Sequence, residues 1–199
     1  MMRFRLIETM GNANNRDLCF LTQFVEGIEG KSYATHLGER LSSIYPKDAR
    51  IPMSPEHPGI KLSALIGNGR SMLIVSSAFK EAIQKHCTNE IEYLPVTIYD
   101  HRNRPYSDDY WIINPIGTFD CLDIEASDIG WSTKSPKKIL RVREYVLDRA
   151  KMQRAPQLFR VEGDPAEYVI GRELARELYD RKLTNVHWTE LRFSDEPRE

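Results

Sequence analysis

The sequence predicts a single α+β domain over residues 1–199, with a mixed β-sheet, two strand–helix–strand units and an irregular N-terminal segment. Three observations lead to this prediction. Residues 72–99 and 168–193 each show the pattern of a strand, a helix and a second strand. An apolar, β-forming run at 110–113 lies between them. Four prolines make residues 46–59 irregular. A chain of this length can bury one core without disulfides.

The N-terminal third has the weakest pattern. Residues 3–8 alternate basic and apolar side chains, as a half-exposed strand does. Residues 18–25 are apolar and aromatic enough for a second strand, which could pair with the first. We expect residues 27–59 to run irregularly over the surface, with a short helix at 35–43.

The first strand–helix–strand unit begins with an apolar strand at 72–75. Ser77 is placed to cap the helix that follows, in which Phe79, Ala82 and Ile83 fall at helical spacing. This helix should end near residues 87–89. The second strand is expected at 91–99.

The second unit repeats this order with a strand at 168–170, a helix at 171–182 and a strand at 186–193. A constant offset of 95 residues superimposes the apolar positions of the two units without a gap, but almost no identities remain. Either the unit is duplicated or any two such units would show the same coincidence, and the sequence leaves both explanations open.

Between the units, the run at 110–113 should lead into a turn at Asn114, Pro115 and Gly117. A mixed acidic and apolar strand is expected at 119–124. Residues 139–148 fit either a strand or a helix. Residues 156–163 fit a short strand closed by a glycine turn.

Composition excludes several classes of function. The net charge is −1, from 28 basic and 29 acidic residues, which argues against a general nucleic-acid binder. The chain has no apolar run near the roughly 20 residues that span a bilayer, and no signal-peptide core at its N-terminus. Its three cysteines are unclustered, as expected for reduced thiols in a cytoplasmic protein.

An acidic centre at Asp120, Cys121 and Asp123 is the candidate for catalysis. On a strand, Asp120 and Asp123 point to opposite faces and cannot form a carboxylate pair. Cys121 has no histidine at a spacing that suggests a base, so a small buried residue is expected. We expect the aspartates to cap backbone groups around the turn or to pair with a basic residue, and the specific hypothesis is that Arg160 pairs with one of them across adjacent strands. The sequence therefore predicts no catalytic residue, no metal site and no cofactor.

Charge is unevenly distributed along the chain. Residues 107–130 contain six acidic residues and no lysine or arginine, whereas residues 131–160 contain nine basic and two acidic residues. The two segments can neutralise each other as neighbouring strands. Alternatively, exposed acids face a basic partner, and the candidates for that role are Asp108, Asp109, Glu125 and Asp128.

Short motifs in residues 60–193 carry a resemblance to a known family. They consist of the Tyr-Trp-Ile-Ile-Asn run, the Asp-Cys-Leu-Asp run with its following serine, and a later Phe-Arg pair. The residues concerned are Tyr110, Trp111, Asn114, Asp120, Asp123, Ser127, Phe159 and Arg160. With these motifs the chain resembles a bacterial family of immunity proteins from polymorphic toxin systems, formerly a domain of unknown function with a myxobacterial namesake. Residues 1–59 match it only weakly, and we expect the motif residues to be structural.

The resemblance implies a cytoplasmic protein that binds and neutralises a cognate toxin, encoded by an adjacent gene, without chemistry of its own. It implies no nucleic-acid and no membrane partner. Two alternatives remain: a small hydrolase that uses the acidic centre at Asp120 and Asp123, and a non-catalytic scaffold module.

Overall fold

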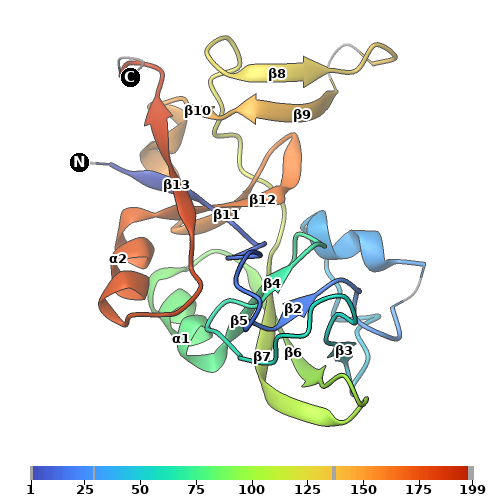
Figure 1. Cartoon of the computed structure of the whole chain (residues 1–199). Coiled ribbons are helices and arrows are strands. Elements are labelled where there is room, and N and C mark those ends of the chain that lie inside the picture. The colour runs from blue at the N-terminus through green and yellow to red at the C-terminus, as the bar shows by residue number, and fades with distance from the viewer. Residues whose placement is uncertain (1, 29, 136–137, 197–199) are drawn as a thin grey trace.

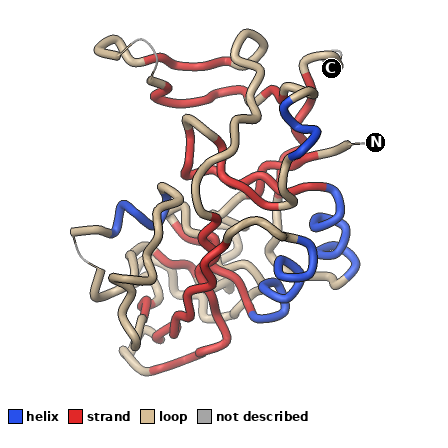
Figure 2. The backbone as a smooth tube through the Cα atoms, turned by 180° about the vertical axis from the view of Figure 1, so that it is seen from behind, coloured by secondary structure: helices blue, strands red, loops and turns tan. Residues whose placement is uncertain are grey.

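The computed structural model describes residues 2–28, 30–135 and 138–196, and it has the α+β fold with mixed sheets that the sequence predicts. In Figure 1 a five-stranded sheet lies between a four-stranded sheet below it and a two-stranded hairpin above it. Both helices lie on one side of the molecule, as Figure 2 also shows from behind. The strands of the four-stranded sheet are, in order, β3 (Arg50–Pro52), β6 (Ile91–Tyr99), β7 (Pro105–Pro115) and β5 (Leu73–Ser76).

The five-stranded sheet combines both ends of the chain. Its order is β10 (Val146–Leu147), β13 (Trp188–Phe193), β1 (Phe4–Ile7), β12 (Asp164–Gly171) and β11 (Leu158–Val161). The smaller pairs are β2 (Phe20–Leu21) with β4 (Gly67–Asn68), and β8 (Asp128–Trp131) with β9 (Ile139–Glu144). Two short 3-10 turns complete the structure, η1 (Ser32–His36) and η2 (Lys151–Arg154).

The two helices are α1 (Ser77–His86) and α2 (Arg172–Asp180). Each turns a narrow apolar stripe inward, as an amphipathic surface helix does. One buried cluster contains Phe79 of α1 and Leu174 of α2 together with Leu73, Ile113 and Tyr168 of the two large sheets. The two strand–helix–strand units therefore share one core.

The two units have the same topology. In the first, β5 and β6 lie on either side of β7 and are both antiparallel to it. In the second, β12 and β13 lie on either side of β1 and are both antiparallel to it. The middle strand of the first unit, β7, follows that unit in the chain, whereas the middle strand of the second unit, β1, precedes it. The sequence pattern therefore did not show that each unit has a middle strand.

The register of the two units is also the same. Leu73 and Tyr93 both pair with Ile113 of the middle strand. The residues 95 positions later, Tyr168 and Trp188, both pair with Ile7. Because equal topology and equal register occur together at one constant offset, we interpret the similarity as favouring duplication over coincidence.

Several predicted elements need correction. Residues 119–124 form isolated bridges from Phe119 to β11 and from Leu122 to β10, and no strand. Residues 18–25 contain only the short β2, which pairs with β4. It cannot pair with β1, because β12 and β13 occupy both edges of that strand. Asn114 and Pro115 end β7, and the turn comes at Gly117, with φ +73°.

Other boundaries moved less. The helix expected at 35–43 is replaced by η1, and the N-cap of α1 is Ser76, one residue before the predicted Ser77. Residues 139–148 are strand, divided into β9 and β10. The segment 27–59 is more than a surface loop, because it supplies β3 and several core side chains. These are Ile28, Ala34, Leu41, Ala49, Ile51 and Met53.

A buried arginine joins the N-terminal segment to both large sheets. The side chain of Arg160 is fully buried in β11. Its guanidinium donates to the carbonyl oxygens of Thr35 (3.0 Å), Pro115 (3.2 Å) and Pro165 (2.7 Å) and to Oδ1 of Asn114 (3.0 Å). It also lies over the ring of Tyr168, 4.4 Å from its centroid. The buried donors are thus satisfied by neutral acceptors.

The side chain of Asn114 links Arg160 indirectly to the carboxylate of Glu92. Its amide nitrogen donates to Glu92 (3.0 Å) and to the carbonyl of Glu39 (2.8 Å). Burial opposes ionisation of Glu92, but hydrogen bonds from Leu41, Ser42 and Asn114 outweigh it, so the pKa of this carboxyl is lowered. The expected pairing of Arg160 with Asp120 or Asp123 is wrong: within the described residues Arg160 forms no ion pair, because backbone carbonyls already surround it.

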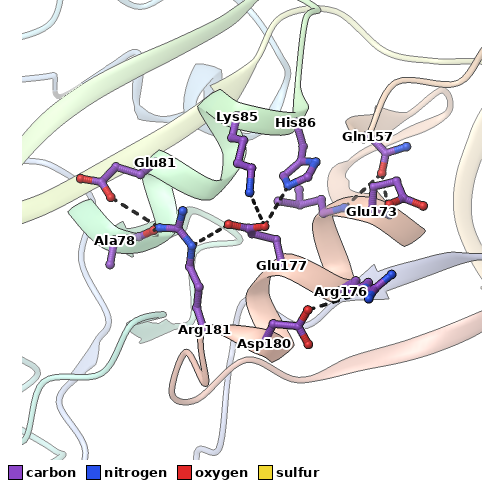
Figure 3. Close-up of polar contacts among 11 residues, drawn as sticks. Ala78, Glu81, Lys85, His86, Gln157, Glu173, Arg176, Glu177, Asp180 and Arg181 are labelled. Atoms are coloured by element: carbon purple, nitrogen blue, oxygen red, sulfur yellow. Dashed lines mark hydrogen bonds and ion pairs between the residues drawn. The ribbon is translucent and has the colours of Figure 1, made fainter.

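A second polar cluster holds the helices together. Glu177 of α2 accepts from Lys85 (2.8 Å) and Arg181 (2.8 Å), and Nε2 of His86 lies 3.3 Å from it (Figure 3). Arg181 also donates to the carbonyl of Ala78 in α1 (3.2 Å). These partners, Lys85 first, lower the pKa of Glu177 from 4.5 to about 2.

We predict that Arg160→Lys lowers the free energy of unfolding by about 3 kcal/mol, because an ammonium cannot reach four acceptors and leaves buried oxygens unpaired. Urea unfolding measures the change. Arg141→Lys, at an exposed position, is the control and should change stability by less than about 0.5 kcal/mol. Equal stabilities of the two variants would contradict the role given to Arg160.

The depressed pKa of Glu177 predicts a pH-dependent contribution to stability. The carboxylate stabilises the fold above the ordinary value of 4.5, and this stabilisation is lost as the pH falls toward 2. Glu177→Gln should therefore lower the urea midpoint at pH 7, by an amount that shrinks between pH 4.5 and pH 2. Glu173→Gln, exposed on the same helix, serves as control. An equal loss at pH 7 and pH 2 would argue against the ion-pair origin.

Candidate partner-binding surfaces

The four acidic residues predicted to face a partner do not form one patch. Asp108 and Asp109 lie on β7, near the β6–β7 hairpin. Glu125 and Asp128 lie just before and at the start of β8. The β6–β7 hairpin and the β8–β9 hairpin are at opposite ends of the molecule in both Figure 1 and Figure 2.

Their electrostatic surroundings also differ. Asp128 forms an ion pair with Arg143 across the β8–β9 hairpin (2.7 Å), so acidic and basic segments neutralise each other there. Asp108 and Asp109 are exposed and form no ion pair with any residue the structure describes. Glu125 is likewise exposed and forms no ion pair with the described residues, but Asp108 and Asp109 differ from it in being adjacent on one strand.

The acidic centre at 120–123 consists of structural contacts. Asp120 accepts from Nζ of Lys151 (2.8 Å), which also donates to the carbonyl of Leu122 (2.8 Å). Asp123 accepts from the N–H groups of Glu125 (3.1 Å) and Ala126 (3.0 Å) and so caps the turn before β8. A hydrogen bond from Ser194, followed by these backbone bonds, lowers the pKa of Asp123.

Cys121 is buried against the five-stranded sheet. Burial raises the pKa of its thiol to about 12, and the same cause raises the pKa of Cys19 and of Cys87 to about 12. A thiol with such a pKa is protonated at neutral pH and is a poor nucleophile. The position of Cys121 matches the small buried residue that the sequence predicts.

The remaining motif residues hold strands and helices in place. The hydroxyl of Tyr110 donates to the carbonyl of Ser63 (2.9 Å). Nε1 of Trp111 donates to Oγ of Ser77 at the start of α1 (3.0 Å). Oγ of Ser127 accepts from the N–H of Val146 (3.1 Å), at the start of β10. The ring of Phe159 is buried and lies 5.0 Å from that of Phe119.

Sequence reasoning missed a serine–histidine contact. Oγ of Ser54 lies 3.1 Å from Nδ1 of His57, in a Ser-x-x-His spacing that a motif search would find. His57 lines a polar cavity of about 540 Å³ beside the Asn-rich turn at 12–16. The same hydroxyl accepts from the N–H of Glu56 (3.3 Å), and the imidazole lies 4.5 Å from the ring of Phe20. This pair therefore stabilises a local turn.

The described residues include no group of three or more His, Cys, Asp or Glu side chains placed to hold a metal ion. None of their helices has the length and apolar character needed to cross a bilayer.

Comparison with known proteins identifies the family. A comparison with curated proteins gave no match. The model of the immunity protein family Imm11 matches residues 8–192. The match includes most of the N-terminal segment. Residues 8–192 contain the Arg160 contacts as well as both strand–helix–strand units. The chain belongs to the Imm11 immunity protein family.

Proposed function

We propose that this protein neutralises a cognate bacterial toxin by binding it directly in the cytoplasm. The observation that carries the proposal is the family match over residues 8–192, which spans nearly the whole fold and not one isolated motif. The toxin is expected to be the product of an adjacent gene. Neither a nucleic acid nor a membrane is part of the proposed mechanism.

The contacts of the acidic centre favour binding over hydrolysis. A hydrolase would need a carboxylate or thiol free to act on a substrate. Here Asp120 is paired with Lys151, Asp123 caps a turn, and the thiol of Cys121 is buried. These contacts give each side chain a structural role and support a protein that acts through its folded surface.

Part of the proposed interface is the acidic pair Asp108 and Asp109, which would face a basic region of the toxin. Both are exposed and without an ion pair in the described structure, so their field is not neutralised locally. Complementary charge of this kind mainly accelerates association. Glu125 and Asp128 would belong to a separate surface at the other end of the molecule.

We predict that co-expression with the toxin of the adjacent gene restores growth of a host that the toxin alone kills. The purified proteins should form a stable complex, measured by pull-down and by size-exclusion chromatography. A toxin from an unrelated gene pair is the control. Rescue without a detectable complex would argue against direct binding.

The second prediction concerns the acidic pair. Asp108→Lys with Asp109→Lys should slow association with the toxin about tenfold at low salt, with a smaller effect at high salt. Stopped-flow or surface-based kinetics measure the rate. A matched double reversal, Glu173→Lys with Asp180→Lys on α2, should leave it nearly unchanged. If the double substitution of Asp108 and Asp109 leaves the association rate at low salt unchanged, these two residues are not part of the interface.

A further inference from the structure

The β8–β9 hairpin, of which residues 128–135 and 138–144 are described, forms an arm that projects from the body of the molecule (Figures 1 and 2). Its attachment is apolar: Val142 is buried, and Ile129 packs against the same cluster as Val142. Ile139 lies against Gly163 in the turn between β11 and β12, where a Cβ would collide with it. The arm is thus anchored through one part of its surface, while the rest faces solvent.

The exposed part of the arm carries large apolar side chains. Trp131 is 42% exposed and Leu140 is 63% exposed. They are separate positions on the arm, because Trp131 pairs with Ile139 and the register shift between Gly130 and Trp131 leaves Leu140 without a cross-strand partner. Single exposed apolar residues are common on protein surfaces, so the charge of the arm is what distinguishes this element.

The arm is also strongly basic. Residues 131–143 include five basic residues and no acidic one. Four of them, Lys134, Lys138, Arg141 and Arg143, are described, and all four are exposed. Only Arg143 is neutralised, by Asp128; the other three form no ion pair with described residues. A surface of this charge favours an acidic partner.

A groove of about 710 Å³ lies at the base of the arm, between Arg143–Tyr145 and the five-stranded sheet. Leu6 and Leu191 of β1 and β13 contribute apolar surface to it, and its charged side chains are balanced, because Arg192 forms an ion pair with Glu144 and Arg3 with Glu190. The basic charge that remains unneutralised therefore lies on the arm and not in the groove.

We infer that the β8–β9 arm docks an acidic surface of the cognate toxin through its unneutralised basic side chains, with Trp131 and Leu140 as apolar contacts. This inference rests on the proposed function and names a second surface, besides Asp108 and Asp109, that would contact the toxin. Buried aromatic anchors determine how long a complex lasts, whereas unpaired charges determine how fast it forms. The arm is basic, whereas the other end of the molecule carries the exposed acids Asp108 and Asp109. A toxin that contacts both ends would present an acidic region to the arm and a basic region to these aspartates.

The test measures binding kinetics between the full-length protein and the purified toxin domain of the adjacent gene. Trp131→Ala with Leu140→Ala should weaken the complex tenfold or more through faster dissociation. Lys138→Glu with Arg141→Glu should slow association about tenfold at low salt. Tyr179→Ala, which removes a 74% exposed aromatic side chain from α2, is the matched control and should bind as the wild type does.

Thermal unfolding separates binding from folding, because the substituted side chains are exposed and should leave the midpoint unchanged. If the wild type does not bind the toxin, the proposed function fails. If the wild type and all arm variants bind equally, the proposed function stands and the arm is not the docking surface. Weakening by Tyr179→Ala of the same size as by the arm variants would also overturn the inference.

Discussion

The buried guanidinium of Arg160 is the interaction on which the rest of the structure depends. It is a charge in the interior whose neighbours are carbonyl oxygens, so the fold must bring those oxygens to it from three separate segments. Thr35 comes from the N-terminal segment, Pro115 from the end of the four-stranded sheet, and Pro165 from the five-stranded sheet. Removal of any one of these segments would leave a buried N–H group of the guanidinium without its acceptor. The arginine therefore makes the N-terminal segment an obligatory part of the domain, in agreement with a family match that begins at residue 8.

The two strand–helix–strand units could be predicted because their signal is local. Helical spacing at Phe79, Ala82 and Ile83 requires no knowledge of the partner strand, and neither does the apolar run of β6. What could not be predicted is the origin of the middle strand of each unit. It is β7 in one case and β1 in the other, at the two ends of the intervening chain, and pairing of this kind is decided by tertiary contacts. The two units have the same strand register at an offset of 95 residues, but this equality depends on the structure, which shows that Ile113 in β7 and Ile7 in β1 occupy equivalent positions.

The candidate partner-binding residues also divide into features that could be predicted from the sequence and features that could not. Charge along the chain was enough to select Asp108 and Asp109 as candidates. Neutralisation of Asp128 by Arg143 could not be predicted in the same way, because it depends on a hairpin whose second strand lies in residues 139–148, which fitted a strand or a helix. The predicted pairing of Arg160 with an aspartate assumed that residues 119–124 form a strand beside it. They instead form isolated bridges, one to β11 and one to β10. Asp120 forms its ion pair with Lys151 and not with Arg160. Charge along the chain identified the basic segment, but its position on a projecting arm is a property of the fold alone.

The motif residues and the exposed surfaces thus serve different purposes. The side chains of Tyr110, Trp111, Asn114 and Arg160 form hydrogen bonds within the domain, so their role is to hold its segments together. Recognition requires side chains that can change without disturbing the fold, and the arm meets that requirement because its attachment uses Val142 and not its exposed positions. A domain whose apolar core is joined by a few buried polar contacts, and whose basic arm is exposed, can accept substitutions on the arm without losing its fold.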